Sequence, residues 1–129
     1  MKLIVLLGVA GALGALSRYA LGGVVQRWTG ASFPYGTLVI NVLGCLIIGY
    51  FMQFALTTDI ISPDIRTLVT IGFLGAFTTF STFSYETTKL LEDGQFVSVI
   101  LNIAANVGLG LAATLLGTLL ARMTLGGVR

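Results

Sequence analysis

The sequence predicts an all-α membrane protein with four transmembrane helices. Of its 129 residues, 56% are hydrophobic and only 9% are charged, whereas soluble domains carry roughly 25% charged residues. The mean hydropathy is +0.99. A helix that crosses a membrane needs about 20 largely apolar residues, and four such windows fit, with most of the charges between them. The windows take up most of the chain, so we expect residues 1–129 to form a single four-helix transmembrane domain.

The first window covers about residues 3–25. Lys2 before an apolar stretch resembles the start of a signal peptide, but the window is too long and leads directly into further spans, so we expect no cleavage. Arg18 lies well inside the window, where its side chain could snorkel to the interface, pair with Glu86 or attract anions to a pore mouth. Small residues in this window predict close packing between helices. They are Gly8, Gly11, Ala12, Gly14 and Ala15.

The second window, about residues 36–56, contains one amide and one thiol at membrane depth. Asn41 must find a partner there or line a wet path. Its N–H donors could bind an anion stripped of water, or they could bond a neighbouring helix, and both interpretations stay open. Cys45 is expected to be a small core residue, because the chain has no histidine to serve as a base for a thiol. Gly44 and Gly49 again predict close packing.

The third window, about residues 65–90, mixes apolar residues with helix-weakening and polar ones. Gly72 and Gly75 lie in its first half. Five hydroxyl residues follow, namely Thr78, Thr79, Ser81, Thr82 and Ser84. Phe80 and Phe83 interrupt them, and their i, i+3 spacing places both rings on one face of a helical turn. Ordinary packing would explain the rings alone, but a polar lane edged by phenylalanine suggests passage of a small ion.

The fourth window covers about residues 96–121. Asn106 lies inside it and has the same two interpretations as Asn41. Small residues again predict that this helix packs closely against its neighbours. They are Ala104, Gly108, Ala112, Gly117 and Ala121.

The basic residues give almost no orientation signal. An even number of spans places both termini on one side, and short connectors make neighbouring helices antiparallel. Four basic residues fall on the terminal side, namely Lys2, Arg66, Arg122 and Arg129. Three fall on the other side, namely Arg18, Arg27 and Lys89. Because Lys and Arg normally accumulate on the cytoplasmic side, this balance permits insertion in both directions and an antiparallel homodimer. A polar path is more easily built between two such subunits than within one.

The residue inventory excludes several classes of function. The chain has one Cys, no His and no pair of carboxylates within a single span, so we do not expect an enzyme. The same inventory leaves main-chain carbonyls as the remaining ligands for a cation. A net charge of +2 is too small to indicate a polyanionic partner such as a nucleic acid.

Three motifs carry a resemblance to a known family. They are GALGALSRY at residues 11–19, GTLVINVLG at 36–44 and GFLGAFTTFSTF at 72–83. The chain resembles the Fluc fluoride channels, a family also called CrcB-like, in length, number of spans and order of motifs. The resemblance implies a dual-topology antiparallel homodimer in the bacterial plasma (inner) membrane, with two pores that passively export fluoride from the cytoplasm.

The resemblance also implies roles for individual residues. Phe80 and Phe83 line the pores, and Asn41 supplies a pore-facing amide. The third helix is broken around residues 75–78, and the main-chain carbonyls at two of its positions hold a central structural sodium ion between the subunits. Those positions are Gly75 and Thr78. Candidates for a hydroxyl track are Thr79, Ser81, Thr82 and Ser84. Candidates for a vestibule are Arg18, Glu86 and Asn106.

The alternative function is a proton-coupled exporter similar to the small multidrug resistance transporters, which also have four spans and dual topology. Those proteins depend on an acidic residue in the first helix. The first window here contains no Asp or Glu, and Glu86 lies late in the third. A purely structural membrane subunit is a further alternative, but it would have no use for a lane of hydroxyl groups and phenylalanines.

Overall fold

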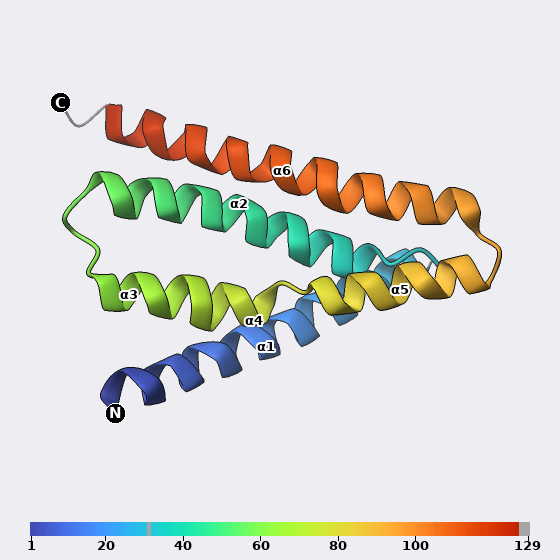
Figure 1. Ribbon diagram of the computed structural model, residues 1–129, viewed down its shortest axis with the longest axis horizontal. Helices are drawn as coiled ribbons and strands as arrows, with labels where there is room; N and C mark the ends of the chain where they lie inside the picture. Colours follow the sequence, from blue (N-terminus) through green and yellow to red (C-terminus); the bar gives the residue numbers. More distant parts are fainter. Residues whose placement is uncertain (31, 127–129) are drawn as a thin grey trace.

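The computed structural model describes residues 1–30 and 32–126, so Arg129 lies outside the described residues. All of its regular structure is helical (Figure 1). Three spans are continuous helices, namely α1 Lys2–Thr29, α2 Tyr35–Thr57 and α6 Phe96–Gly126. The third span consists of α3 Pro63–Thr67, the π-helix η1 Leu68–Leu74, α4 Gly75–Phe77 and α5 Phe80–Glu92. All four spans are long and apolar enough to cross a membrane, which confirms the predicted number.

Neighbouring spans run in opposite directions, as the short connectors predict. The start of α1 and the end of α6 lie at the same end of the molecule, together with the connector between α2 and α3 (Figure 1). The connectors between α1 and α2 and between α5 and α6 lie at the other end. Helices α2 and α6 lie side by side, whereas α1 crosses the third span obliquely and packs against η1 and α4.

Gln26 fixes the turn between α1 and α2. Helix α1 ends at Thr29 and is followed by Gly30, whose left-handed φ of 57° favours glycine and whose N–H donates to the Gln26 carbonyl. The Gln26 side chain donates to the Phe33 carbonyl at 3.1 Å and accepts the Gly36 N–H at 3.1 Å. One side-chain amide on α1 therefore satisfies a backbone group of the connector and another in the first turn of α2.

Glycines let α2 and α6 approach to backbone contact. A Cβ atom at Gly49 would collide with the Thr114 carbonyl, and a Cβ atom at Gly117 would collide with the Leu46 carbonyl. The predicted close packing is therefore confirmed at these two positions. Close packing is likewise confirmed at Gly14 and Gly44, where an added Cβ atom would collide with the third span.

The outer surfaces of α1 and α6 are apolar and open. A Cβ atom added at Gly8 or Gly108 would meet no atom of another helix within 4 Å, so the prediction that they pack closely is wrong within one chain. Large side chains on the same helices are exposed, such as Leu16 at 64% and Leu115 at 65%. Such surfaces suit lipid or another polypeptide chain rather than water.

A small core holds the helix turn that precedes the break in the third span. Ile40, Leu74 and Phe77 form one buried cluster, with exposed fractions of 3%, 2% and 4%. Burial of side chains of this size contributes roughly 1.5–3 kcal/mol each. The cluster anchors α4 against α2, and it thereby positions the backbone that follows Phe77.

The third span breaks at Thr78 and Thr79. Gly75 is regular helix with φ −62° and ψ −35°, so within the predicted range of residues 75–78 only Thr78 belongs to the break. Thr78 (φ −82°, ψ 160°) and Thr79 (φ −152°, ψ 118°) are extended before α5 begins. Thr79 caps α5, because its Oγ1 accepts the Thr82 N–H at 3.1 Å. A break near the middle of the span is confirmed, and a threonine cap rather than glycine freedom defines where it falls.

Candidate functional site

Two cavities meet at the break in the third span. The first has a volume of about 570 Å³ and is lined by residues of α1, α2 and α5. The second has a volume of about 370 Å³ and is lined by α2, α6 and both halves of the broken span. Thr79 lines both cavities. A path from one cavity to the other therefore passes the cap of α5.

Asn41 binds the backbone that the break exposes. Its Oδ1 accepts the Thr79 N–H at 2.9 Å, and its Nδ2 donates to the Thr79 carbonyl at 3.2 Å. Nδ2 also donates to Oδ1 of Asn106 at 3.0 Å. The amide thus bonds the third span and α6, and Asn41 also lines the second cavity.

A chain of hydrogen bonds continues from Asn106 into the protein interior. Nδ2 of Asn106 donates to the carbonyl and to Oδ1 of Asn102, both at 3.0 Å. Asn102 is 1% exposed and donates to Oγ1 of Thr87 at 2.9 Å. Thr87 in turn donates to the Phe83 carbonyl at 2.7 Å. This series of hydrogen bonds therefore links α6 to α5 and fixes the direction in which each amide points.

Asn102 is a site residue that the sequence interpretation missed. It lies four residues before Asn106, and the i, i+4 spacing on one helix is the signal that could have found it. The spacing predicts contact between the two amides but not which N–H faces which oxygen. Asn106 lines the second cavity with Asn41, whereas Arg18 and Glu86, the other predicted vestibule residues, line the first.

Phe80 and Phe83 form a ring pair at the second cavity, in agreement with their spacing. Their ring centroids are 5.6 Å apart and the ring planes are tilted by 54°. Phe83 is 9% exposed and Phe80 is 78% exposed. The Phe83 ring is therefore buried within the chain, while the Phe80 ring projects from it. Tilted rings present their electropositive edges as well as their faces to a neighbouring group.

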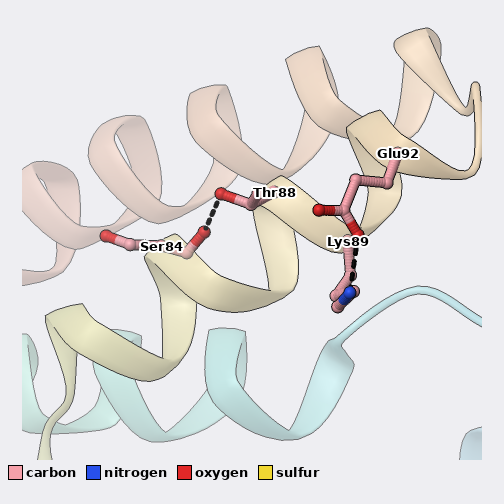
Figure 2. A network of polar contacts seen from close by, with 4 residues as sticks. All are labelled: Ser84, Thr88, Lys89 and Glu92. Atoms are coloured by element: carbon pink, nitrogen blue, oxygen red, sulfur yellow. Dashed lines mark hydrogen bonds and ion pairs between the residues drawn. The ribbon is translucent and has the colours of Figure 1, made fainter.

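Three of the four candidate track hydroxyls form a cluster at the cap of α5. Oγ1 of Thr79 donates to Oγ1 of Thr82 at 3.0 Å and lies 3.4 Å from Oγ of Ser81. Ser84 lies one turn further along α5, where its carbonyl accepts the Thr88 hydroxyl at 3.0 Å (Figure 2). The structure therefore brings Thr79, Ser81 and Thr82 together and leaves Ser84 apart.

Helix α5 carries several polar side chains, most of which are exposed. Figure 2 shows Ser84, Thr88, Lys89 and Glu92 on this helix, with the ion pair between Lys89 and Glu92. Thr88, Lys89 and Glu92 are exposed although they belong to a span. Charged and hydroxyl groups are costly in contact with lipid. These side chains therefore need water or another polypeptide chain beside them.

The first cavity combines two carboxyl residues, Glu86 and Asp93, with cationic groups. Thr37 donates to Oε1 of Glu86 at 2.8 Å, while Oε2 of Glu86 is buried without a hydrogen-bond partner. Arg18 and Lys89 line the same cavity. Among the described residues the sole ion pair joins Lys89 to Glu92, so the pairing of Arg18 with Glu86 is not formed. Arg18 therefore forms no ion pair within the described residues.

Main-chain oxygens are the cation ligands that the break offers. No group of three or more His, Cys, Asp or Glu side chains comes together within residues 1–30 and 32–126. In a continuous helix the Thr79 N–H would donate to the Gly75 carbonyl. Here it donates to the side chain of Asn41 instead. The Thr82 N–H likewise turns to Oγ1 of Thr79 and not to the Thr78 carbonyl. Gly75 and Thr78 line the second cavity, and main-chain oxygens are ligands of the kind that a hard cation such as sodium takes.

The chain is similar to known proteins over most of its length. The model of the family described as CrcB-like protein, Camphor Resistance (CrcB), matches residues 5–118. The fluoride-specific ion channel FluC of Geobacter metallireducens is 52% identical over 122 residues, which are 95% of this chain and 98% of that protein. The protein of the same name from Geobacter sulfurreducens gives the same identity and coverage. That from Dehalococcoides mccartyi strain CBDB1 is 48% identical over 117 residues, 91% of this chain and 90% of that protein.

Proposed function

This chain belongs to the CrcB-like family, and we propose that it is a fluoride-selective ion channel that passively exports fluoride from the bacterial cytoplasm. Relatives named fluoride-specific ion channels match it over almost the full length of both chains. Its four apolar helices make it a multi-pass membrane protein. As a passive channel it is not an enzyme.

The observation that carries the proposal is the convergence of Asn41, Thr79 and the Phe80–Phe83 ring pair on one cavity. Fluoride is small and strongly hydrated, so it leaves water only where other donors replace the lost hydrogen bonds. Amide and hydroxyl groups supply donors, and ring edges add positive potential without a full charge. Several weak sites in series permit throughput, whereas a single strong site would trap the ion.

The proposed path begins in the first cavity. Arg18, which forms no ion pair among the described residues, would raise the concentration of anions there. The path then passes the hydroxyl cluster at the cap of α5 and follows Phe83 and Phe80. Ser84 would contribute one turn further along α5. A larger halide would fit poorly between groups set this closely, which is our account of the selectivity.

We propose that two copies form an antiparallel homodimer with two pores. The exposed polar side chains of α5 and the exposed Phe80 ring support this assembly, since a second chain could cover them. The near balance of basic residues permits both orientations. An Asp93→Cys variant in a Cys45→Ala background tests the orientation in cells with a membrane-impermeant thiol reagent. Labelling of about half the chains is expected for dual topology, and complete or absent labelling would contradict it.

We further propose a structural sodium ion held by the Gly75 and Thr78 carbonyls of both copies. The hydrogen bonds that these carbonyls lack support a cation at the break. The experiment compares dimer dissociation in sodium chloride and in N-methylglucamine chloride at equal ionic strength. Weaker association without sodium is expected. Equal association in the two salts would show that sodium is not needed.

Ion efflux from liposomes tests the proposed function directly. Vesicles loaded with potassium fluoride and potassium chloride receive the purified protein, and ion-selective electrodes follow both anions after addition of a potassium ionophore. Fast, ionophore-dependent loss of fluoride with negligible loss of chloride is expected. Fluoride loss that needs a proton gradient instead would favour the exporter. If neither anion leaves vesicles that contain intact protein, the channel proposal is wrong.

A further inference from the structure

Asn41 has no N–H left for an anion in the structure. One of its two N–H groups donates to the Thr79 carbonyl at 3.2 Å and the other to Oδ1 of Asn106 at 3.0 Å. An anion that binds Asn41 must therefore displace one of these two acceptors. The strength of the displaced hydrogen bond is subtracted from the net affinity for the ion.

The pairing with Thr79 is the harder of the two to open. It consists of two hydrogen bonds in opposite directions between the same two groups, at 2.9 Å and 3.2 Å. Opening it would leave a peptide group unsatisfied at the break in the third span. The contact with Asn106 is a single hydrogen bond between two side chains that both line the second cavity. Asn106 is therefore the acceptor that can yield.

Asn102 holds Asn106 with its oxygen toward Asn41. Both N–H groups of Asn106 are used, at 3.0 Å each, by the carbonyl and Oδ1 of Asn102. An inverted Asn106 amide would bring its oxygen against the Asn102 carbonyl, which cannot change from acceptor to donor. Asn102 is itself buried and tied to Thr87. Asn106 thus offers the path an acceptor and not a donor.

We propose that Asn106 is a competing acceptor, which occupies one N–H of Asn41 in the absence of fluoride and yields it when the ion arrives. The inference rests on the proposed function as a fluoride channel. In it, Asn106 lowers the affinity of Asn41 for the ion. Its oxygen satisfies a donor that would otherwise be unpaired at membrane depth. The competition lowers the affinity at Asn41, which shortens the time that each ion stays. Asn102 acts as the positioning residue for this acceptor.

Two substitutions at one position separate this role from that of an anion donor. Asn106→Leu removes the acceptor and keeps a similar volume, while Asn106→Asp keeps an acceptor toward Asn41. Both variants lose the N–H donors of Asn106. If Asn106 served as an anion donor, both would weaken fluoride binding. A competing acceptor requires opposite changes, with tighter binding in Asn106→Leu and weaker binding in Asn106→Asp.

The measurement is a sodium fluoride titration of the ¹⁵N-labelled full chain in detergent, followed through the side-chain amide signal of Asn41. Loss of one competing hydrogen bond is expected to lower the half-saturating fluoride concentration of Asn106→Leu by about fivefold. The maximal fluoride efflux from liposomes is expected to fall in the same variant, because the ion leaves more slowly. Asn106→Ala is the second variant if leucine is not accommodated, with the same expected direction.

Thr118→Val is the matched control on α6. Thr118 bonds the carbonyls of Gly49 and Thr114, far along the helix from Asn106, so the half-saturating concentration is expected to stay at the wild-type value. Unchanged or weaker fluoride binding in both folded Asn106→Leu and Asn106→Ala would overturn the inference. The channel proposal would still stand in that case, provided that the wild-type protein transports fluoride. A wild-type protein that neither binds nor transports fluoride would overturn both.

Discussion

Asn41 and Thr79 are joined by two hydrogen bonds in opposite directions, in which the Thr79 N–H donates to the side-chain oxygen at 2.9 Å and the side-chain amide donates to the Thr79 carbonyl at 3.2 Å. The side chain thus takes the place of the helix that is interrupted there. An unsatisfied peptide group in the membrane core costs several kcal/mol. One residue of α2 therefore stabilises the break around which both cavities are arranged.

Replacement of Asn41 should destabilise the break itself. Asn41→Leu leaves the Thr79 N–H and carbonyl without partners, and we expect a loss of about 1–3 kcal/mol in the free energy of unfolding. Asn41→Asp keeps the acceptor for the Thr79 N–H but sets its second oxygen against two other acceptors, so it should also destabilise the break. Thermal unfolding in detergent provides the measurement. Equal midpoints for the wild type and Asn41→Leu would show that the break does not depend on this pair.

The ring pair should control the rate of fluoride passage. Phe83→Ile and Phe80→Ile remove a ring edge that we assign to the path, and a contribution of about 1 kcal/mol corresponds to roughly fivefold slower efflux. Phe73→Ile is the matched control, since the stacked Phe73–Phe77 pair lines neither cavity. Slower efflux is expected only in the first two variants. Wild-type rates in both of them, from intact protein, would remove the rings from the path.

Arg18 should act at long range through its charge. Arg18→Gln is expected to slow fluoride efflux at low ionic strength, because fewer anions gather in the first cavity. The difference from the wild type should shrink at high salt, where the Debye length falls from about 10 Å at 0.1 M to about 3 Å at 1 M. Arg122→Gln, which changes an exposed residue outside both cavities, should leave the rate unchanged. A salt-independent loss in Arg18→Gln would indicate a direct contact instead.

The backbone contact between α2 and α6 should not tolerate a side chain. Gly117→Ala places a Cβ atom against the Leu46 carbonyl, and such overpacking costs roughly 1–3 kcal/mol. Gly11→Ala is the control, because its Cβ would lie 3.8 Å from the Gly72 carbonyl, an ordinary contact. Alanine favours helix over glycine by about 1 kcal/mol, so this control should be neutral or stabilising. Thermal unfolding of the two variants in one detergent gives the comparison, and equal midpoints would contradict it.

The spans and the ring pair could be predicted because they depend on neighbours along the chain. Apolar windows of sufficient length identify helices in a membrane whatever their partners are. The contact of Phe80 with Phe83 follows from helix geometry alone, since residues three apart share a face. The resemblance placed the break around residues 75–78, and the structure places it at Thr78 and Thr79, because the cap at Thr79 and the partner Asn41 decide where the helix ends.

The sequence alone determined the number of membrane-spanning helices and the polar lane in the third of them. It also determined that the chain has no histidine and a single cysteine. The tertiary structure alone decided how the buried amides are used. Asn41 and Asn106 are 65 positions apart and Asn106 could equally have pointed a donor or an acceptor at Asn41. Asn102 selected the acceptor, because its two oxygens take both N–H groups of Asn106. Hydrogen-bond direction between distant residues depends on which partners the fold brings together, and composition and spacing do not contain it.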